Sequence, residues 1–373
     1  MTEESSFSID ENWTTLLRFL PSGWMNKAKE LNALNRLRGF SGPDVLLRVM
    51  LLHLVSGHSL RVTTTLAREG GLANISDVAL FKRIKSAGDW FLWMAQEMRN
   101  AWLADPGKQP TPQLCFRAVD ATVVNEPGAT GSTWRIHYSI QLNTLACDEV
   151  HITTERTGES FTNFAVNKGD VFLGDRGYHS TAGIFHIVDN GGHVIVRMRS
   201  SVNFYNLLAE RFELLDRISD MSEGEVREYP ILLQKGGRTL PCRVCVVKKT
   251  EEMAQKSRHA AQLRANRKGQ RLQPETLEFS GYVLILSTLP SAYRAESIME
   301  IYRQRWQIEL VFKRLKSLLG VGHLRKQDAG SSRAWLQGKL FVAMLLETFT
   351  RAGEAFFPWG YPIPVEESEK PLA

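Results

Sequence analysis

The spacing of apolar residues divides the chain into a helical part and a part made of strands. From Trp13 to Trp102 apolar residues recur at intervals of three and four, which predicts an all-α N-terminal region. The segment 105–110, DPGKQP, ends this pattern with two prolines and a glycine. We therefore expect a helical N-terminal domain followed by a domain of a different class.

Two of the N-terminal helices have the layout of a helix-turn-helix unit. The segment 60–69 ends at a Gly-Gly pair, and Ser76 is a good N-cap for the next helix. In such a unit the second helix faces DNA, with Lys82, Arg83 and Lys85 meeting phosphates. A helical hairpin without DNA contact has the same pattern, so both interpretations stay open.

After residue 110 the apolar period changes to two, which is typical of strands. The expected strands cover residues 114–124, 133–143, 149–155, 170–175, 193–198, 227–233, 239–249 and 282–289. The first three are joined by short loops, which indicates an antiparallel meander. A helix over 180–189 then connects two strands and implies a right-handed crossover, so the sheet is mixed. Residues 201–281, with a basic helical segment over 250–270, look like an insertion into this sheet.

The composition sets broad limits on function. The chain has 373 residues, 43% hydrophobic, and a net charge of +6, which favours a polyanionic partner without requiring one. The acidic start shows no signal-peptide pattern and no apolar run approaches about 20 residues, so we expect a cytoplasmic protein without a membrane partner. Cys242 and Cys245 lie in a strand-like run where their side chains point to opposite faces, which disfavours a zinc site.

The segment Ile301–Leu319 predicts one amphipathic helix, since it has good helix formers and neither proline nor glycine. At about 100° per residue, one polar stripe carries Tyr302, Arg305, Glu309 and Lys316, next to a separate apolar face. A carboxylate beside two cations and a phenol suits a metal ion and an anionic polymer. The same charges are also ordinary salt-bridge partners on a solvated face.

Two aspartates in the strand region change the weight of these interpretations. Asp120 lies inside an apolar strand, where an unpaired carboxylate is costly to bury. Asp175 follows a buried strand at its C-terminal end, a common position for a ligand-binding side chain. Taken alone, each aspartate fits a helix cap or a turn former better than a ligand-binding residue. Together with Glu309 they form an oxygen-only set that favours Mg²⁺ or Mn²⁺ and two-metal phosphoryl transfer.

Three motifs now give the chain a resemblance to a known family. They are VDATVV around Asp120, Asp175-Arg176-Gly177-Tyr178, and Tyr302-x2-Arg305-x3-Glu309-x6-Lys316. In kind and order these motifs resemble those of DDE transposases of bacterial insertion sequences, in the branch marked by a Tyr-Arg-Glu-Lys signature. The resemblance covers residues 114–338 well and the N-terminal region by overall layout.

The resemblance implies an α/β fold of the α+β kind, with an RNase H-like mixed sheet flanked by helices. It divides the chain into residues 1–108 (helical, DNA-binding), 109–200 (catalytic core, first part), 201–281 (β-rich insertion), 282–330 (core, second part) and 331–373 (C-terminal helix and tail). In the last stretch the apolar side chains belong either to the core, which we favour, or to a dimer interface; they are Trp335, Leu336, Phe341, Leu345 and Phe349.

By the same resemblance, Asp120, Asp175 and Glu309 are the catalytic residues and bind two Mg²⁺, for which Mn²⁺ can substitute. Glu309 must then lie within several ångströms of both aspartates. The implied reaction is DNA cleavage at the transposon ends. The freed 3′ hydroxyl then attacks either the opposite strand, forming a hairpin, or target DNA.

The implied DNA contacts come from Tyr302, Arg305 and Lys316, which hold phosphates near the cut. Arg176 either meets a DNA phosphate or pairs with Asp175, and we expect the pairing. The partners implied are double-stranded DNA, as terminal inverted repeats and as target, and a second copy in a homodimer or synaptic complex. Two rival hypotheses remain: an inactive or domesticated DNA-binding descendant, and a stand-alone RNase H-like nuclease.

Overall fold

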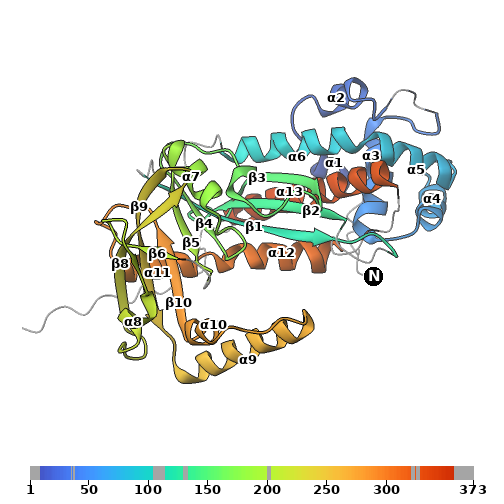
Figure 1. Cartoon of the computed structure of the whole chain (residues 1–373). Helices are drawn as coiled ribbons and strands as arrows, with labels where there is room; N and C mark the ends of the chain where they lie inside the picture. Colours follow the sequence, from blue (N-terminus) through green and yellow to red (C-terminus); the bar gives the residue numbers. More distant parts are fainter. Residues whose placement is uncertain are drawn as a thin grey trace, which may run out of the picture. The chain divides into compact units, whose positions relative to one another are not determined.

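The computed structural model describes residues 9–34, 36, 38–103, 114–128, 133–199, 203–320, 324 and 328–356 (Figure 1). The chain forms two compact units, which are described one at a time. The first combines Met1–Ala104 with Leu315–Ala373, and the second is Asp105–Arg314. In the described part of the chain, no helix is both long and apolar enough to cross a membrane.

The first unit is helical, as the apolar spacing predicts. Its helices are α1 (Ile9–Leu17), α2 (Trp24–Glu30), α3 (Pro43–Ser56), α4 (Leu60–Glu69), α5 (Asp77–Ser86), α6 (Gly88–Leu103) and α13 (Ala329–Phe356). The long α13 packs against α6, α5 and α3. Phe341 stacks on Phe91 with ring centroids 5.8 Å apart, and Trp335, Leu336 and Leu345 are buried as well. These side chains of the last helix therefore belong to the core.

Helices α4 and α5 form the expected pair. The Ser76 hydroxyl accepts a hydrogen bond from the N–H of Ala79 at 3.2 Å and so caps α5. The chain turns at Ala87, between the end of α5 and the start of α6. A Cβ at Gly88 would lie 3.0 Å from Ala334, so glycine lets the first turn of α6 approach α13 closely.

The second unit is built on an eight-stranded mixed sheet. Its strands are β1 (Cys115–Val124), β2 (Trp134–Gln141), β3 (Cys147–Thr154), β4 (Asp170–Gly174), β5 (His193–Arg197), β8 (Val226–Lys235), β9 (Arg238–Lys248) and β10 (Tyr282–Ser287). They lie in the order β3-β2-β1-β4-β5-β10-β9-β8. The β1–β4 and β4–β5 pairs are parallel, and the other neighbours are antiparallel. Helix α7 (Thr181–Asp189) makes the crossover from β4 to β5, so the predicted mixed sheet is confirmed.

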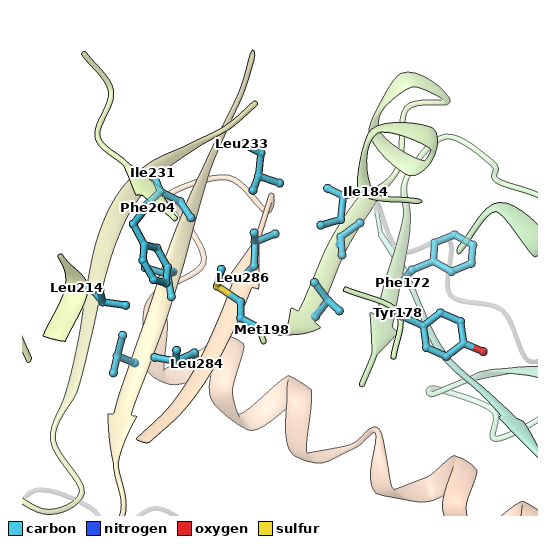
Figure 2. Packing of buried hydrophobic residues seen from close by; sticks show 14 of the residues in the cluster. Phe172, Tyr178, Ile184, Met198, Phe204, Leu214, Ile231, Leu233, Leu284 and Leu286 are labelled. Atoms are coloured by element: carbon cyan, nitrogen blue, oxygen red, sulfur yellow. The ribbon is translucent and has the colours of Figure 1, made fainter. Parts of the chain in front are cut away.

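The inserted segment contributes its two long strands to this same sheet. Its other elements are β6 (Phe204–Tyr205), β7 (Arg211–Phe212), α8 (Leu214–Ile218), α9 (Glu251–Arg267) and α10 (Pro274–Phe279). Figure 2 shows one hydrophobic cluster in which Phe204 and Ile231 of the insertion pack with Met198, Leu284 and Leu286 of the core strands. The insertion and the core strands thus share buried surface, whose removal from water stabilises both.

The predicted single helix Ile301–Leu319 is interrupted. The N–H groups of Gln304 and Arg305 bond to carbonyls three residues earlier, at 3.0 and 3.1 Å, which tightens the chain into a 3₁₀-like turn. The uniform 100° winding assumed from the sequence therefore fails at this turn. The two helices on either side are α11 (Ala295–Arg303) and α12 (Trp306–Leu319).

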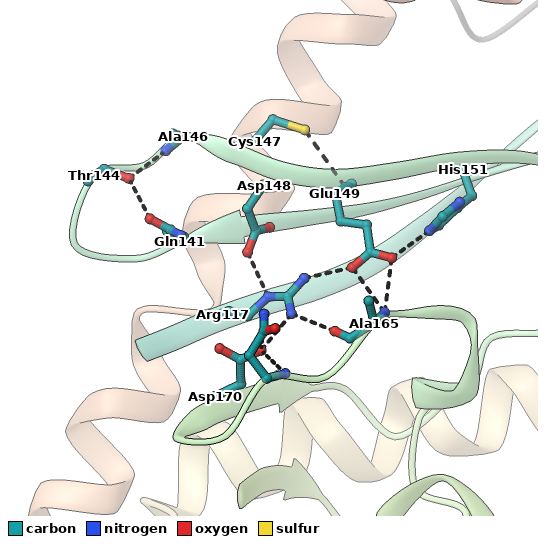
Figure 3. A network of polar contacts seen from close by, with 11 residues as sticks. Arg117, Gln141, Thr144, Ala146, Cys147, Asp148, Glu149, His151, Ala165 and Asp170 are labelled. Carbon is teal, nitrogen blue, oxygen red and sulfur yellow. Dashed lines mark hydrogen bonds and ion pairs between the residues drawn. The ribbon is translucent and has the colours of Figure 1, made fainter. Parts of the chain in front are cut away.

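A buried ionic network fixes the strands that lead to the site (Figure 3). Arg117 of β1 contacts Asp148 at 2.6 Å, Glu149 at 2.8 Å and Asp170 at 2.9 Å. The acids come from β3 and β4, so one guanidinium holds three strands together. Asp120 follows Arg117 by three residues on β1, and the network therefore anchors the strand that carries it.

Candidate active site

Asp120 of β1 and Asp175, the first residue after β4, lie at the same level of two neighbouring parallel strands. The paired register of β1 and β4 ends at Ala118 and Leu173, and each aspartate follows two residues later. Neighbouring strands are about 4.8 Å apart, so this register brings the two carboxylates close together. The two carboxylates also interact electrostatically, because the charge of Asp175 contributes to raising the pKa of Asp120.

Local hydrogen bonds orient both carboxylates. Asp175 accepts a hydrogen bond from the N–H of Gly177 at 2.7 Å, and Asp120 accepts one from the N–H of Ala121 at 2.8 Å. Arg199, just beyond β5, donates through Nε to the carbonyl of the residue after Asp175 at 3.0 Å. The loop that follows β4 is therefore fixed by a hydrogen bond within the loop and by one from Arg199, and these two bonds restrict the orientation of Asp175.

Burial raises the pKa of Asp120 to about 6, and the charges of Asp175 and Glu159 add to this rise. The Ala121 N–H and Arg305 act in the opposite direction without cancelling it. The side chain is 21% exposed. A carboxylate in this setting is incompletely neutralised by the protein, so a cation at this point would be favourable.

Glu309 reaches this pair through Arg305. The Arg305 guanidinium hydrogen-bonds Glu309 Oε1, and its Nη1 lies 3.8 Å from Asp120 Oδ2. Arg305 itself is 15% exposed, so both contacts form in a partly desolvated place. The structure thus brings Glu309 to Asp120 by way of one shared cation. That Glu309 lies within several ångströms of Asp175 as well stays a prediction.

The apolar face of α12 positions Glu309. Ile308 and Phe312 are buried, and the Phe312 ring meets the Tyr138 ring edge to face, with centroids 6.0 Å apart. Tyr138 is the register partner of Asp120 on β2. The helix is therefore packed on the sheet next to the strand that carries Asp120, as the predicted apolar face requires.

The other signature residues have different surroundings. Tyr302 lies in the last turn of α11 with a buried hydroxyl, and burial raises its pKa. Its ring centroid lies 5.8 Å from the Arg305 guanidinium. Lys316 is exposed on α12, about two turns beyond Glu309. Arg176 is exposed and forms no ion pair with any carboxylate of the described residues. The expected pairing of Arg176 with Asp175 therefore does not take the form of a direct ion pair here, although the charge of Asp175 still acts on Arg176.

Glu159 is a site residue that the sequence analysis missed. A Cβ added at Gly177 would lie 2.3 Å from Glu159 Oε2 and 3.0 Å from Asp175 Oδ1, so the two carboxylates meet beside this glycine. Burial raises the pKa of Glu159, and Asp175 raises it further. No motif marks residue 159, because it reaches the site from the loop after β3 through tertiary packing.

Tyr178 completes the floor of the site. Its side chain is fully buried, and its hydroxyl has no hydrogen-bond partner within the described part of the chain. Burial raises its pKa, and Asp120, Glu159 and Asp175 raise it further, so the phenol stays neutral. A buried O–H on which the charges of three acids act is a donor that a carboxylate or a bound water can use.

The donor set fits Mg²⁺ or Mn²⁺, because only carboxylate oxygens gather here. In the ranges the structure describes, no three His, Cys, Asp or Glu side chains form a ready metal cage. Mg²⁺ does not need one, since it binds through one or two carboxylates and keeps several waters. Asp120 and Asp175 meet that requirement. They belong to adjacent strands, and the charge of Asp175 acts on Asp120.

The predicted cations of α5 lie in the other unit. Lys82 is exposed. Arg83 donates to the Arg36 carbonyl and lies 5.9 Å from the Phe40 ring centroid, and Lys85 pairs with an aspartate at 2.8 Å. Two of the three cations thus have partners within the fold. Their contact with DNA stays a prediction.

Comparison with known proteins relates the chain to one family. Residues 112–345 match the family model described as transposase DDE domain. Two proteins from Escherichia coli, the putative transposase InsL for insertion sequence element IS186A and the transposase for insertion sequence element IS421, are each 31% identical over 93% of this chain and 96% of their own length. The transposase for insertion sequence element IS231E from Bacillus thuringiensis subsp. finitimus is 22% identical over 87% of this chain and 76% of its own. Asp120, Asp175 and Glu309 all lie inside the matched span, and the chain belongs to the DDE transposase family.

Proposed function

We propose that this transposase cuts DNA at the ends of an insertion sequence with Asp120, Asp175 and Glu309 as its catalytic carboxylates. The observation that carries the proposal is the shared level of the two aspartates on β1 and β4, with Arg305 joining Asp120 to Glu309. Phosphoryl transfer needs negative side chains gathered at one point, and the register of β1 and β4 supports such a gathering at Asp120 and Asp175.

Two bound Mg²⁺ ions, for which Mn²⁺ can substitute, would activate the attacking oxygen and stabilise the leaving oxygen. Asp120 and Asp175 would hold these ions from the sheet, and Glu309 would hold them from α12. Hydrolysis breaks one P–O bond and leaves a 3′ hydroxyl. That hydroxyl then attacks a phosphodiester, in target DNA or in the opposite strand, and displaces another 3′ oxygen.

The cations around the carboxylates bind the DNA backbone. Tyr302, Arg305 and Lys316 hold phosphates near the cut, and Arg176 meets a phosphate from the exposed side of the loop after β4. Double-stranded DNA is the partner, as terminal inverted repeats and as target.

The helical region 1–108 adds DNA contacts through Lys82, Arg83 and Lys85 of α5.

Cutting two ends together requires a homodimer or larger synaptic complex. The protein acts in the bacterial cytoplasm, on the nucleoid.

The test is cleavage of labelled insertion-sequence-end DNA in Mg²⁺ by the full chain. Asp120→Asn, Asp175→Asn and Glu309→Gln should each abolish cleavage while end binding persists. Glu213→Gln, which alters a 64% exposed carboxylate away from the site, should cut like wild type. Retained cleavage in any of the three variants would overturn the catalytic assignment. Cleavage of arbitrary DNA would instead identify a stand-alone nuclease, and end binding without cleavage by wild type a DNA-binding descendant.

A further inference from the structure

A cationic pocket lies beside the loop that carries Asp175. It has a volume of about 220 Å³ and lies between α9 and α10 of the inserted segment, the two helices drawn side by side in Figure 1. Its charged lining consists of Arg264, Lys268 and Arg271 from the insertion and Arg176 from the loop. No acidic side chain is among the described residues that line it.

The four cations have no acidic side chain paired with them among the described residues. None of them forms an ion pair with a carboxylate of the ranges the structure describes. The first half of α9 behaves differently, since Lys256 pairs with Glu252 at 2.6 Å and Arg258 with Glu251 at 2.9 Å. Positive charge left without acids on one half of a helix, and gathered around a hollow, favours an anion from outside the chain.

A further positive charge lies behind the pocket wall. Lys249 donates to the carbonyl of Ser280, a lining residue, at 2.7 Å. Burial lowers the pKa of Lys249 to about 8, and Arg197, Arg176 and Arg258 lower it further, so cations are crowded here. Such crowding is relieved when an anion binds.

The pocket wall is preorganised. Ala265 and Phe279 are buried beneath the cations, and the Phe279 ring packs on Phe204 with centroids 6.5 Å apart. The N–H of Gln270 returns to the carbonyl of Ala265 at 2.9 Å and fixes the turn that ends α9. The side chains therefore converge from fixed backbone positions, which lowers the entropic cost of holding a compact anion.

We propose that this pocket binds one backbone phosphate of the DNA strand engaged at the Asp120 and Asp175 site. The inference rests on the proposed function. The pocket is connected to the catalytic site through the chain itself, because Arg176 lines the pocket and directly follows Asp175. The inserted segment thereby supplies a second DNA subsite, built from Arg264, Lys268 and Arg271, next to the catalytic one.

The first test compares Arg264→Gln, Lys268→Gln and Arg271→Gln with a matched control, Arg267→Gln. Arg267 is an exposed cation of the same helix that does not line the pocket. Fluorescence anisotropy with labelled end DNA should show about tenfold weaker binding for each pocket variant. The slope of log affinity against log salt should fall by about one. The control should bind like wild type, and all four should melt like wild type because the side chains are exposed.

The second test locates the phosphate. Single uncharged methylphosphonate linkages are placed one at a time along the end DNA. At one position near the cut the substitution should weaken wild type and Arg267→Gln about tenfold, yet have no further effect on Lys268→Gln. Additive losses at every position would overturn the inference.

The two levels of the proposal fail differently. If wild type cuts end DNA but the pocket variants match it in affinity and salt slope, the pocket inference alone is wrong. If wild type neither binds nor cuts end DNA, the proposed function fails, and the inference fails with it.

Discussion

Arg305 Nη1 lies 3.8 Å from Asp120 Oδ2, and the same guanidinium hydrogen-bonds Glu309. A single cation at the turn between α11 and α12 therefore contacts a carboxylate from the sheet and one from a helix. Arg305 is 15% exposed, so these charges are screened little by water. The stability of this part of the fold should depend on which cation stands beside the acids.

Replacing Arg305 by Met should make the protein more responsive to Mg²⁺. Without the guanidinium, Asp120 and Glu309 lose their shared partner, so we expect the metal-free variant to lose about 1 to 3 kcal/mol. A divalent ion bound to the folded state offsets part of that loss. Thermal melting with and without Mg²⁺ should show a larger shift for Arg305→Met than for wild type.

The matched control is Arg238→Met, which removes an exposed pair with Asp189 at 2.6 Å. This change should leave the Mg²⁺-dependent shift in melting temperature unaltered. An equal shift in wild type, Arg305→Met and the control would contradict the role given to Arg305.

The raised pKa of Asp120 predicts a pH dependence of stability. Its folded-state pKa is about 6 against an ordinary 3.8, so the folded state favours the protonated form. The contribution of Asp120 to stability is therefore fully present below about pH 3.8 and is lost as the pH rises through 6. In chelator, Asp120→Asn should be more stable than wild type above pH 6, by up to about 3 kcal/mol, with little difference near pH 4. Urea unfolding from pH 4 to 8 measures this, and parallel curves would refute it.

The sequence predicted the elements of the second unit better than their meeting points. Strand positions followed from the period of two and the turn residues between them, and both aspartates were singled out by their place on strands. Their common level depends on the register of β1 against β4, which long-range pairing sets and no local pattern records. Glu159 was missed for the same reason.

The helix that carries Glu309 shows the limit of periodicity. Nothing between residues 301 and 319 is a helix breaker, so spacing alone predicts one continuous element. The chain turns at Gln304 and Arg305, and the guanidinium thereby faces the acids. Arg176 gives a second case. A neighbouring carboxylate predicted a local pair, while its guanidinium lines a pocket with a helix about 90 residues further along the chain.

Alanine substitutions at Gly177 and Gly174 should affect different properties, the first cleavage and the second stability. A methyl group at Gly177 would meet Glu159 Oε2 at 2.3 Å and Asp175 Oδ1 at 3.0 Å, both ends of side chains that can shift. Gly177→Ala should therefore reduce end cleavage strongly while costing less than about 1 kcal/mol of stability. A methyl at Gly174 would meet Phe161 at 2.7 Å and Tyr178 at 2.8 Å in the packed core, so Gly174→Ala should cost about 1 to 3 kcal/mol. Cleavage rates and urea unfolding of both variants check this, and full activity in Gly177→Ala would contradict it.

The Arg117 network should dominate the stability of the catalytic sheet. Arg117→Met removes the only guanidinium that contacts Asp148, Glu149 and Asp170 among the described residues and leaves three largely buried acids facing one another. Breaking a buried ion pair from one side costs about 3 to 5 kcal/mol, because the remaining charge has lost its partner. Burial already raises the pKa of Asp148, so part of the loss in stability should be recovered at low pH, where these acids are protonated.

The control is Arg211→Met, which breaks an exposed pair with Glu213 and should cost less than about 1 kcal/mol. Urea unfolding at pH 5 and pH 8 distinguishes the two variants, and a small, pH-independent loss in Arg117→Met would show that the network does not hold the strands together.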